Sequence, residues 1–257
     1  KNKYVIATIE ARMTSSRLPG KVLMEANKGI SMLEFMINRV KKSKLIDKIV
    51  VATTINETCQ PIVNLCNKLK IDYYRGSEDD VLLRVLNAHK KFKSDIIVEL
   101  TGDCPLIDPD IIDQIISCYM ENDFDYVSNS HVRSYPDGFD VQVFSTNLLN
   151  YISKKTNDPY DRENVSSYFY RTNEFNIHGV IASKELFWPE LRVTLDDKGD
   201  YLLIHNIINN LDLKHGNSFK AIDVVRYLKE NPKLLELIKD ARVSDAPYQY
   251  TADAPSK

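Results

Sequence analysis

The chain has 257 residues, of which 43% are hydrophobic and 27% charged, so it can bury a large core and is not a disordered polypeptide. Its formal net charge of -2 provides no global attraction for a polyanion, which argues against a nucleic-acid partner. The apolar runs reach about six residues, far below the roughly 20 that span a bilayer, and no apolar signal-peptide stretch opens the chain, so we expect a soluble, cytoplasmic protein without a membrane partner.

Roughly the first 130 residues alternate short β-branched runs with longer segments of helical period, which is the pattern of β-α-β units around a parallel sheet. Strands are predicted at residues 4–10, 48–53, 72–75, 95–100 and 126–129. Helices are predicted from a capping box at Ser31 to Val40, and over about 61–69, 79–92 and 108–121. Right-handed crossovers then favour a doubly wound α/β sheet, in which ligands bind beyond the carboxyl ends of the strands.

The pattern changes between residues 134 and 188, where aromatic residues become dense and residues 139–144 alternate like an antiparallel strand. We expect an inserted region here that acts as an acceptor lid or as a subunit contact, and hence a homodimer. The sheet pattern resumes at residues 191–195, and helices are expected through Ile238. We therefore predict a single domain over residues 1–240, followed by an extended tail over 241–257.

A basic loop follows the first predicted strand and carries Arg12, Arg17 and Lys21. A loop that leaves a buried strand can direct backbone N–H groups and cationic side chains toward one point, as a triphosphate requires. The loop is neither a Walker A loop nor a dinucleotide fingerprint, because GxxxxGK[ST] and GxGxxG are both absent. A solvated basic turn is the alternative interpretation.

Two further stretches place acidic residues where strands are predicted to end. Asp103 follows Thr101-Gly102 after one strand, and Asp196 follows the predicted strand at 191–195. Two carboxylates that arrive at one sheet edge could share a Mg²⁺ ion, which either alone would bind weakly. Helix capping is the alternative for Asp197 and Asp200, and the predicted role for Asp108. His89 and His131 are expected on helix or loop surfaces.

Six stretches of the sequence occur together and in a familiar order. They read ARMTSSRLPGKVL, RGSEDDVL, LTGDCPLIDP, YPDGFDVQVF, DRENVSSYFYR and RVTLDD. In this combination the chain resembles the cytidylyltransferase superfamily, in the branch typified by spore-coat polysaccharide biosynthesis cytidylyltransferases, which is related to CMP-sugar acid synthetases. The resemblance covers residues 4 to about 205.

The resemblance implies a three-layer α/β/α nucleotide-binding fold with a mostly parallel sheet, CTP as donor, Mg²⁺ as cofactor, and transfer of CMP to a small-molecule acceptor with release of pyrophosphate. It implies catalytic roles for Arg12, Arg17, Lys21 and Asp103, and metal binding by Asp103 and Asp196. It implies nucleotide binding by Ala11, Arg12, Ser15, Ser16, Arg17, Lys21, Arg75, Ser77, Asp80, Thr101 and Gly102. It implies acceptor binding by Tyr135, Asp137, Gly138, Asp140, Arg162 and Glu163. The segment 73–84 by itself is an ordinary strand-turn-helix junction, and Asn164 stands where the family often has histidine.

Several alternatives remain open at this point. The acceptor is a sugar acid for a surface polysaccharide, or a phosphonate- or phosphate-bearing small molecule. A sugar hydroxyl would need a general base or a second metal, and Asp140, Glu163 and His178 are the candidates for the base. A glycosyltransferase of the GT-A architecture and a catalytically silent nucleotide-binding module are the alternatives from other functional classes.

Overall fold

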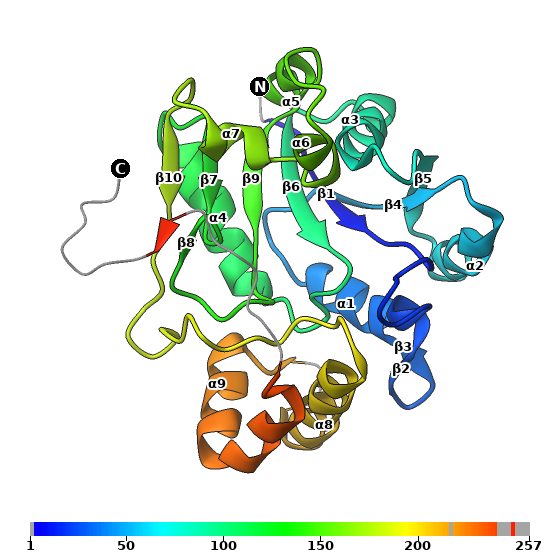
Figure 1. Ribbon diagram of the computed structural model, residues 1–257, viewed down its shortest axis with the longest axis vertical. Coiled ribbons are helices and arrows are strands. Elements are labelled where there is room, and N and C mark those ends of the chain that lie inside the picture. The colour runs from blue at the N-terminus through cyan, green and yellow to red at the C-terminus, as the bar shows by residue number, and fades with distance from the viewer. Residues whose placement is uncertain (1–2, 216–217, 241–247, 250–257) are drawn as a thin grey trace.

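The computed structural model describes residues 3–215, 218–240 and 248–249. Seven strands of this part of the chain form a central sheet in the order β10-β7-β9-β6-β1-β4-β5 (Figure 1). The strands are β1 (Val5–Glu10), β4 (Lys48–Thr54), β5 (Asp72–Gly76), β6 (Ile96–Thr101), β7 (Tyr126–Ser128), β9 (Gln142–Ser145) and β10 (Ile177–Gly179). Neighbouring strands run parallel, except that β9 is antiparallel to β6 and β7. The mostly parallel α/β fold expected from the sequence is confirmed.

The predicted elements of the first half of the chain lie close to the observed ones. The helices there are α1 (Met32–Val40), α2 (Gln60–Leu69), α3 (Val81–Phe92) and α4 (Pro109–Glu121). Their N-termini show why the sequence patterns worked. The Ser31 hydroxyl accepts a hydrogen bond from the Glu34 N–H at 3.2 Å, and Asp108 caps α4 in the same manner through the Asp110 N–H at 2.9 Å.

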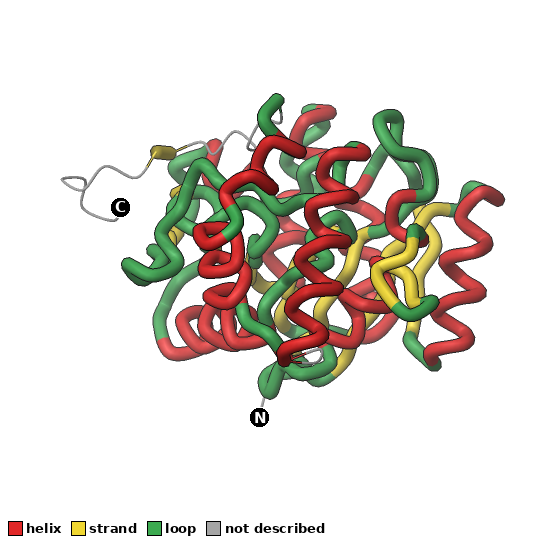
Figure 2. The backbone as a smooth tube through the Cα atoms, turned by 90° about the horizontal axis from the view of Figure 1, so that it is seen from below, coloured by secondary structure: helices red, strands yellow, loops and turns green. Residues whose placement is uncertain are grey.

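Helices cover both faces of the sheet, as Figure 2 shows. Along β1, Val5, Ala7 and Ile9 pack toward one helical layer, whereas Ile6 packs toward the other. The first layer contains α1, α2, α4, α8 (Lys198–His215) and α9 (Ala221–Glu230), and the second contains α3, α5 (Thr146–Ile152) and α7 (Ser167–Arg171). The three layers α/β/α are thus built on the alternation of each strand.

Shorter elements complete the described chain. They are β2 (Glu25–Asn27), β3 (Ile30–Ser31), β8 (Val132–Arg133), β11 (Tyr248–Gln249), α6 (Pro159–Glu163) and the 3₁₀ turns Lys21–Leu23, Glu57–Cys59 and Pro232–Ile238. β11 pairs with β8, and the rest of the predicted tail over 241–257 lies outside the described residues. Within the described part of the chain, no helix has the length and apolar character needed to traverse a membrane.

The aromatic region 134–188 contributes strands to the main sheet. β9 lies between β6 and β7, and β10 forms the sheet edge beside β7. The antiparallel strand expected at 139–144 is therefore present, as β9, in the interior of the sheet. The lid or subunit-contact role of this region stays a prediction.

One predicted strand is wrong. Residues 191–195 do not join the sheet; they form an extended segment with an isolated bridge between Arg192 and Asp137. In Figure 1 this part of the chain runs across below the arrowheads of β1 and β6 before it enters α8. We call residues 191–196 the crossing segment. Its backbone groups bond to loops at the carboxyl edge rather than to a neighbouring strand.

Candidate active site

The carboxyl ends of β1 and β6 meet at a point where only glycine fits. The N–H of Gly102 donates a hydrogen bond to the carbonyl of Glu10 at 2.8 Å. A Cβ atom at position 102 would lie 2.5 Å from the same oxygen, so any side chain would push the two strands apart. Asp103 follows directly and is therefore held at the edge of the sheet beside the basic loop.

The crossing segment brings Asp196 to the same place. The Leu195 N–H donates to the Asp103 carbonyl at 2.7 Å, and the Val193 N–H donates to the Asp137 carbonyl at 2.7 Å. Gly138 permits this close approach, because its φ is +116° and a Cβ there would lie 2.9 Å from the backbone of Val193. The two predicted metal ligands are thus positioned by backbone contacts between distant parts of the chain.

Lys21 and Arg17 contact these acids directly. The Nζ atom of Lys21 lies 2.9 Å from Asp196 Oδ1 and 3.6 Å from Asp103 Oδ2, and Nη2 of Arg17 lies 2.9 Å from Asp196 Oδ1. Burial raises the pKa of Asp196, but the charges of Lys21 and Arg17 outweigh it, so the pKa is below its usual value. Four residues predicted as parts of one site are therefore in contact.

Arg12 points to a different neighbour. Its Nη1 atom lies 4.0 Å from Glu78 Oε1, and the Thr14 hydroxyl donates to the same carboxylate. The Asn56 amide donates to the other oxygen of Glu78 at 3.2 Å. Glu78 thereby fixes the start of the basic loop. Contact of Arg12 with a triphosphate stays a prediction.

The other predicted residues of the basic loop and of the β6 end have local roles. Ala11 is buried and its N–H donates to the Ala52 carbonyl at 3.2 Å. The Ser15 hydroxyl accepts from the Leu18 N–H at 3.4 Å, and Ser16 is exposed. Thr101 lies at the pocket described below, with its hydroxyl 3.3 Å from Cys104 Sγ. These contacts hold the basic loop and the end of β6 in place next to the four contacting charges.

The segment predicted near the nucleoside, residues 75–80, makes structural contacts. Arg75 donates hydrogen bonds to three backbone carbonyls at the end of β4 and in the loop that follows it, at 3.0, 3.1 and 3.0 Å. Ser77 and Asp80 form the N-terminal cap of α3: Ser77 Oγ accepts from the Asp80 N–H at 3.0 Å, and Asp80 Oδ1 from the Leu83 N–H at 2.9 Å. Nucleotide contacts of these three residues stay predictions.

A pocket of about 520 Å³ opens next to the four contacting charges. It lies among the ends of β1, β6 and β9, the loop after β7, the α6–α7 connection and the crossing segment. We call it the carboxyl-edge pocket. Its lining includes three of the residues predicted to bind the acceptor, Asp137, Asp140 and Glu163. It also includes Asn164, whose side-chain amide donates to the Tyr160 carbonyl at 2.8 Å.

The other three residues predicted to bind the acceptor, Tyr135, Gly138 and Arg162, are not among the residues that line the pocket. Tyr135 is buried in the core, where its hydroxyl donates to Gln114 at 3.2 Å. Arg162 donates to the carbonyls of Ser153 at 2.6 Å and Thr156 at 2.8 Å and lies 3.3 Å from Asp80. It therefore ties α6 to the start of α3.

Arginines that sequence reasoning did not single out hold the predicted acids in place. Arg133 forms two hydrogen bonds with the Asp140 carboxylate, at 2.6 and 3.0 Å. Burial lowers the pKa of Arg133, but the negative charge of Asp140 has the larger effect, so the pKa is raised.

Arg192 contacts buried Asp200 at 2.5 Å, and Asp200 also accepts from the N–H groups of Asp196 and Asp197 at 2.9 and 3.0 Å. Asp200 thus shapes the turn that presents Asp196.

Two glutamates that the sequence analysis did not identify also line the pocket. Glu99 in β6 is buried, with 4% of its surface exposed, and Glu10, the last residue of β1, is partly buried. Burial raises the pKa of Glu10 to about 7 and raises that of Glu99 well above its usual value. The signal was present in the sequence, because a charged residue inside the apolar run IIVELT is expensive to bury.

The expected surface positions of two histidines are wrong. His89 is fully buried between Ser94, at 2.9 Å, and Thr8, at 3.3 Å, and burial lowers its pKa to about 3. His131 is buried at the carboxyl-edge pocket, 2.6 Å from Ser128, and burial lowers its pKa to about 4. Thr8, which is distant in the sequence, is a partner of buried His89, whereas the partner of His131 is Ser128, three residues away.

Comparison with known proteins decides the family. The pattern of the family described as cytidylyltransferase matches residues 6–209. The chain belongs to the cytidylyltransferase family. It is 30% identical over 235 residues to the spore coat polysaccharide biosynthesis protein SpsF of Bacillus subtilis, covering 89% of this chain and 95% of that protein.

Two further relatives agree with this family. A 3-deoxy-manno-octulosonate cytidylyltransferase of Koribacter versatilis is 27% identical over 198 residues, which cover 72% of each chain. The solved structure of a cytidylyltransferase from Leptospira borgpetersenii superposes with a TM-score of 0.85 at 31% identity, covering 91% of this chain and 97% of that one. The fold and the family are therefore shown over most of the described chain.

In this cytidylyltransferase, Asp103 and Asp196 have the chemistry of a magnesium site. Mg²⁺ is bound by oxygen ligands, typically one or two carboxylates with water and substrate phosphate completing the shell. The Lys21 ammonium lies between both carboxylates, so a positive charge is stabilised at this point. Among the described residues no cluster of three or more metal-ligating side chains occurs, so the substrate would have to complete the shell. The two acids fit Mg²⁺ in that mode.

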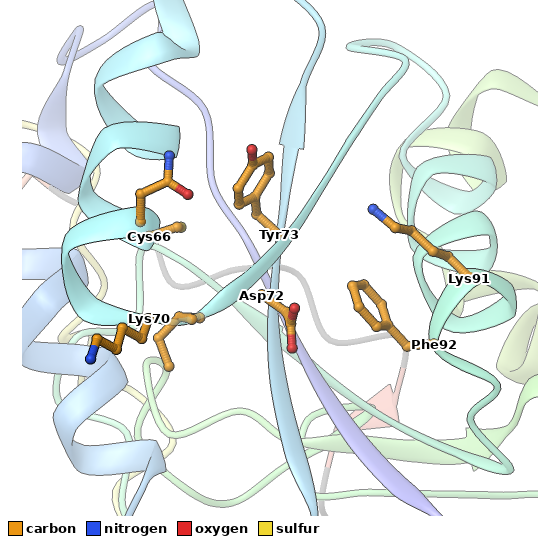
Figure 3. Close-up of a pocket in the computed structure, with 8 residues that line it drawn as sticks. Cys66, Lys70, Asp72, Tyr73, Lys91 and Phe92 are labelled. Carbon is orange, nitrogen blue, oxygen red and sulfur yellow. The ribbon is translucent and has the colours of Figure 1, made fainter.

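A second pocket, of about 490 Å³, lies at the opposite end of β5 (Figure 3). Figure 3 shows Asp72 and Tyr73 on β5, between Cys66 on α2 and both Lys91 and Phe92 on α3. The carboxylate of Asp72 is paired with Lys48 of β4. None of the predicted site residues lines this pocket, and it is at the amino end of a parallel strand, where doubly wound sheets rarely bind substrate.

Proposed function

We propose that this protein transfers CMP from CTP to a hydroxyl of a sugar acid and releases pyrophosphate, with Mg²⁺ held by Asp103 and Asp196. The observation that carries the proposal is the contact of Lys21 with both acids beside a pocket of substrate size. The family supports CTP as donor, and the named activity of the Koribacter versatilis relative supports a sugar acid as acceptor. The Bacillus subtilis relative supports a product used for a surface polysaccharide.

The chain's own residues would perform the transfer mainly by positioning and charge. The acceptor oxygen has to attack the α-phosphorus in line with the departing pyrophosphate, so the triphosphate lies along the basic loop and the acceptor in the carboxyl-edge pocket. Arg17 and Lys21 then offset the charge that develops on the pyrophosphate. Bound Mg²⁺ supplies further charge neutralisation at the phosphate oxygens. The phosphorus-oxygen bond to the acceptor forms as the bond to the β-phosphate breaks.

The three candidates for the base that accepts the hydroxyl proton differ in their contacts and exposure. His178 lies on β10 and stacks on Phe124 with ring centroids 4.7 Å apart. Asp140 is held in two hydrogen bonds by Arg133. Glu163 is exposed and lines the carboxyl-edge pocket, so we propose it as the base. A carboxylate within hydrogen-bond reach of the acceptor hydroxyl can accept its proton.

The alternatives are less well supported. A phosphate or phosphonate acceptor would bring two negative charges into a pocket that is lined by Asp137, Asp140 and Glu163, which is unfavourable. Membership of the cytidylyltransferase family favours nucleotidyl transfer over glycosyl transfer by a GT-A enzyme. The contact of Lys21 with both acids favours an active enzyme over a silent binding module.

The test is a pyrophosphate-release assay with CTP, UTP, ATP and GTP, each against a panel of sugar acids, sugar phosphates and phosphonates in the presence of Mg²⁺. The panel contains 2-keto-3-deoxy sugar acids in matched pairs, with a hydroxyl or an amino group at the terminal carbon. We expect release with CTP and a sugar acid. Faster turnover with another nucleotide, or with the phosphonates, would contradict the proposal.

We also propose a homodimer formed through the region 134–188, where α6 leaves Tyr160 half exposed. Sedimentation velocity at micromolar concentration tests this. A monomer would contradict it.

A further inference from the structure

One short connection between two helices forms part of the wall of the carboxyl-edge pocket. The residues of this region that line the pocket are Tyr160 and Glu163 of α6, Asn164 and Ser166 between the helices, and Tyr170 of α7. Glu163 is the residue proposed above as the base. We call the connection 164–166 the wall turn. Its conformation decides what this side of the pocket presents to the acceptor.

The wall turn is strained at its central residue. Val165 has a φ of +49°, although it is β-branched. The Ser166 N–H donates to the Asn164 carbonyl at 2.5 Å, two residues back along the chain, which is the hydrogen bond of a γ-turn. The form of this turn with a positive φ is rare, and a non-glycine residue keeps it only where the surrounding structure enforces it. Contacts outside the turn therefore hold it in place.

Asp161 makes such contacts from one side of the wall turn to the other. The residue is 2% exposed. Its Oδ1 atom accepts hydrogen bonds from two groups of α7, the Ser167 hydroxyl at 2.6 Å and Nη1 of Arg171 at 2.7 Å. Its Oδ2 atom accepts from the Thr156 hydroxyl, in the segment before α6, at 2.8 Å. One buried carboxylate thus ties α6 to α7 across the turn.

A neighbouring ion pair between the same helices is weaker. Asp158 Oδ2 lies 3.0 Å from Nη2 of Arg171, with side chains that are 43% and 39% exposed. Water and salt weaken an exposed ion pair, whereas a buried carboxylate that loses a donor is left with an unsatisfied oxygen. The Val165 side chain is itself buried in the apolar cluster of the second helical layer, which helps to hold the turn. Among these polar links, the bonds of Asp161 are the stronger ones.

We propose that Asp161 is a positioning residue for acceptor binding: its bonds across the wall turn hold Val165 in the strained conformation and keep Glu163 at the pocket. The proposal rests on the function proposed above and adds a residue that acts on the acceptor through the turn. Asp161 itself does not line the pocket. A chain binds the acceptor well only while the turn is in place, so the apparent affinity falls with the fraction of chains that keep it.

Calorimetry on the full chain measures this affinity. The ligands are the 2-keto-3-deoxy sugar acids with a terminal hydroxyl, added in the presence of Mg²⁺ and α,β-methylene-CTP. Asp161→Asn should weaken sugar-acid binding at least about tenfold, because release of a strain of this kind shifts the equilibrium of the turn by about that factor. It should leave the affinity for the CTP analogue unchanged. Ser167→Ala removes one of the three hydrogen bonds and should give a smaller loss of the same kind.

A glycine at the centre of the turn provides a readout that a general structural role would not move. Glycine adopts a positive φ without strain, so a turn with glycine at position 165 no longer needs Asp161 to enforce it. Asp161→Asn should therefore lower sugar-acid affinity much less in a Val165→Gly background than in the parent. Asp158→Asn is the matched control. It weakens the exposed ion pair with Arg171, keeps the cap of α6, and should leave sugar-acid affinity unchanged.

Unchanged sugar-acid affinity in both Asp161→Asn and Ser167→Ala would overturn the proposal, as would an equal loss of affinity for the CTP analogue. An equal effect of Asp158→Asn, or a loss that is as large in the Val165→Gly background, would also overturn it. If Asp161→Asn does not fold, Ser167→Ala in the two backgrounds gives the same comparison. A parent chain that binds none of the sugar acids would contradict the proposal. Failure of the proposed function alone would appear as sugar-acid binding without release of pyrophosphate from CTP.

Discussion

The backbone N–H of Leu195 donates a hydrogen bond to the carbonyl of Asp103 at 2.7 Å. This contact joins the crossing segment to the end of β6, so Asp196, the next residue, lies within reach of the Lys21 ammonium that also contacts Asp103. The relative position of the two acids therefore depends on main-chain geometry. Either carboxylate can be replaced by an amide without disturbing that geometry.

Replacement of Asp103 or Asp196 by asparagine should abolish most of the activity. Each change removes a charge that the proposed reaction uses to hold Mg²⁺, and we expect kcat to fall at least about a hundredfold. The assay is pyrophosphate release at saturating CTP and Mg²⁺. Asp110→Asn is the control, because its side chain is 67% exposed and its ion pair with Lys220 is remote from the site. Near-normal turnover of Asp103→Asn would remove this residue from the metal site.

Lys21→Met should lower both activity and stability at neutral pH. The activity loss, about a hundredfold, follows from removing a charge that stabilises the leaving pyrophosphate. Lys21 also lowers the pKa of Asp196 in the folded chain. Such a carboxyl stabilises the folded state at pH values above its pKa in the unfolded chain. This stabilisation is lost as the pH falls through the pKa of the folded chain. The difference in Tm between variant and parent should therefore be largest at pH 7 and shrink near pH 3. Lys68→Met, which replaces an exposed lysine, is the control and should change neither the activity nor the stability. A difference in Tm between Lys21→Met and the parent that does not depend on pH would refute the electrostatic role of Lys21.

Arg162→Ala separates a structural role from a binding role. The side chain donates to two backbone carbonyls and contacts Asp80, so its removal should destabilise the fold by about 2 kcal/mol. Chemical denaturation measures the loss. The KM for the acceptor should change little, since Arg162 does not line the carboxyl-edge pocket. An unchanged stability combined with a large rise in KM would instead assign Arg162 to acceptor binding.

Glu10→Gln should raise stability, and the gain should depend on pH. Burial raises the pKa of Glu10 from 4.5 to about 7, so between these values the folded chain holds more protons than the unfolded chain. Stability then falls as the pH rises through this window. A glutamine does not ionise, so the Tm of the variant should exceed that of the parent at pH 8, and the difference should narrow at pH 5. A gain that is the same at both pH values would show that ionisation of Glu10 is not its cause.

The sequence predicted the parts of the site that follow from the geometry of a parallel sheet. Asp103 and the loop carrying Arg17 and Lys21 follow strands that end at one edge, so their proximity could be inferred from the order of strands and helices. The caps at Ser31 and Asp108 were equally local signals, because the side chain and the N–H it accepts from are three or fewer residues apart.

The failures share a different cause. Residues 191–195 have the composition of a strand, but their N–H groups bond to the carbonyls of Asp103 and Asp137, which only the tertiary structure brings near. His89 appeared to be a polar surface residue of α3, yet Thr8 and Ser94 provide partners that allow it to be buried. Burial of a polar residue depends on partners from other elements, and a single sequence does not pair them.

The most direct test of the central claim follows the label of the nucleotide through the reaction. The chain is incubated with Mg²⁺, the sugar acids and CTP that carries ³²P either at the α-phosphate or at the γ-phosphate. We predict that the α-label appears in an adduct with the sugar acid and that the γ-label appears in pyrophosphate. Appearance of the γ-label in inorganic phosphate, with no adduct that contains the α-label, would contradict CMP transfer at this site.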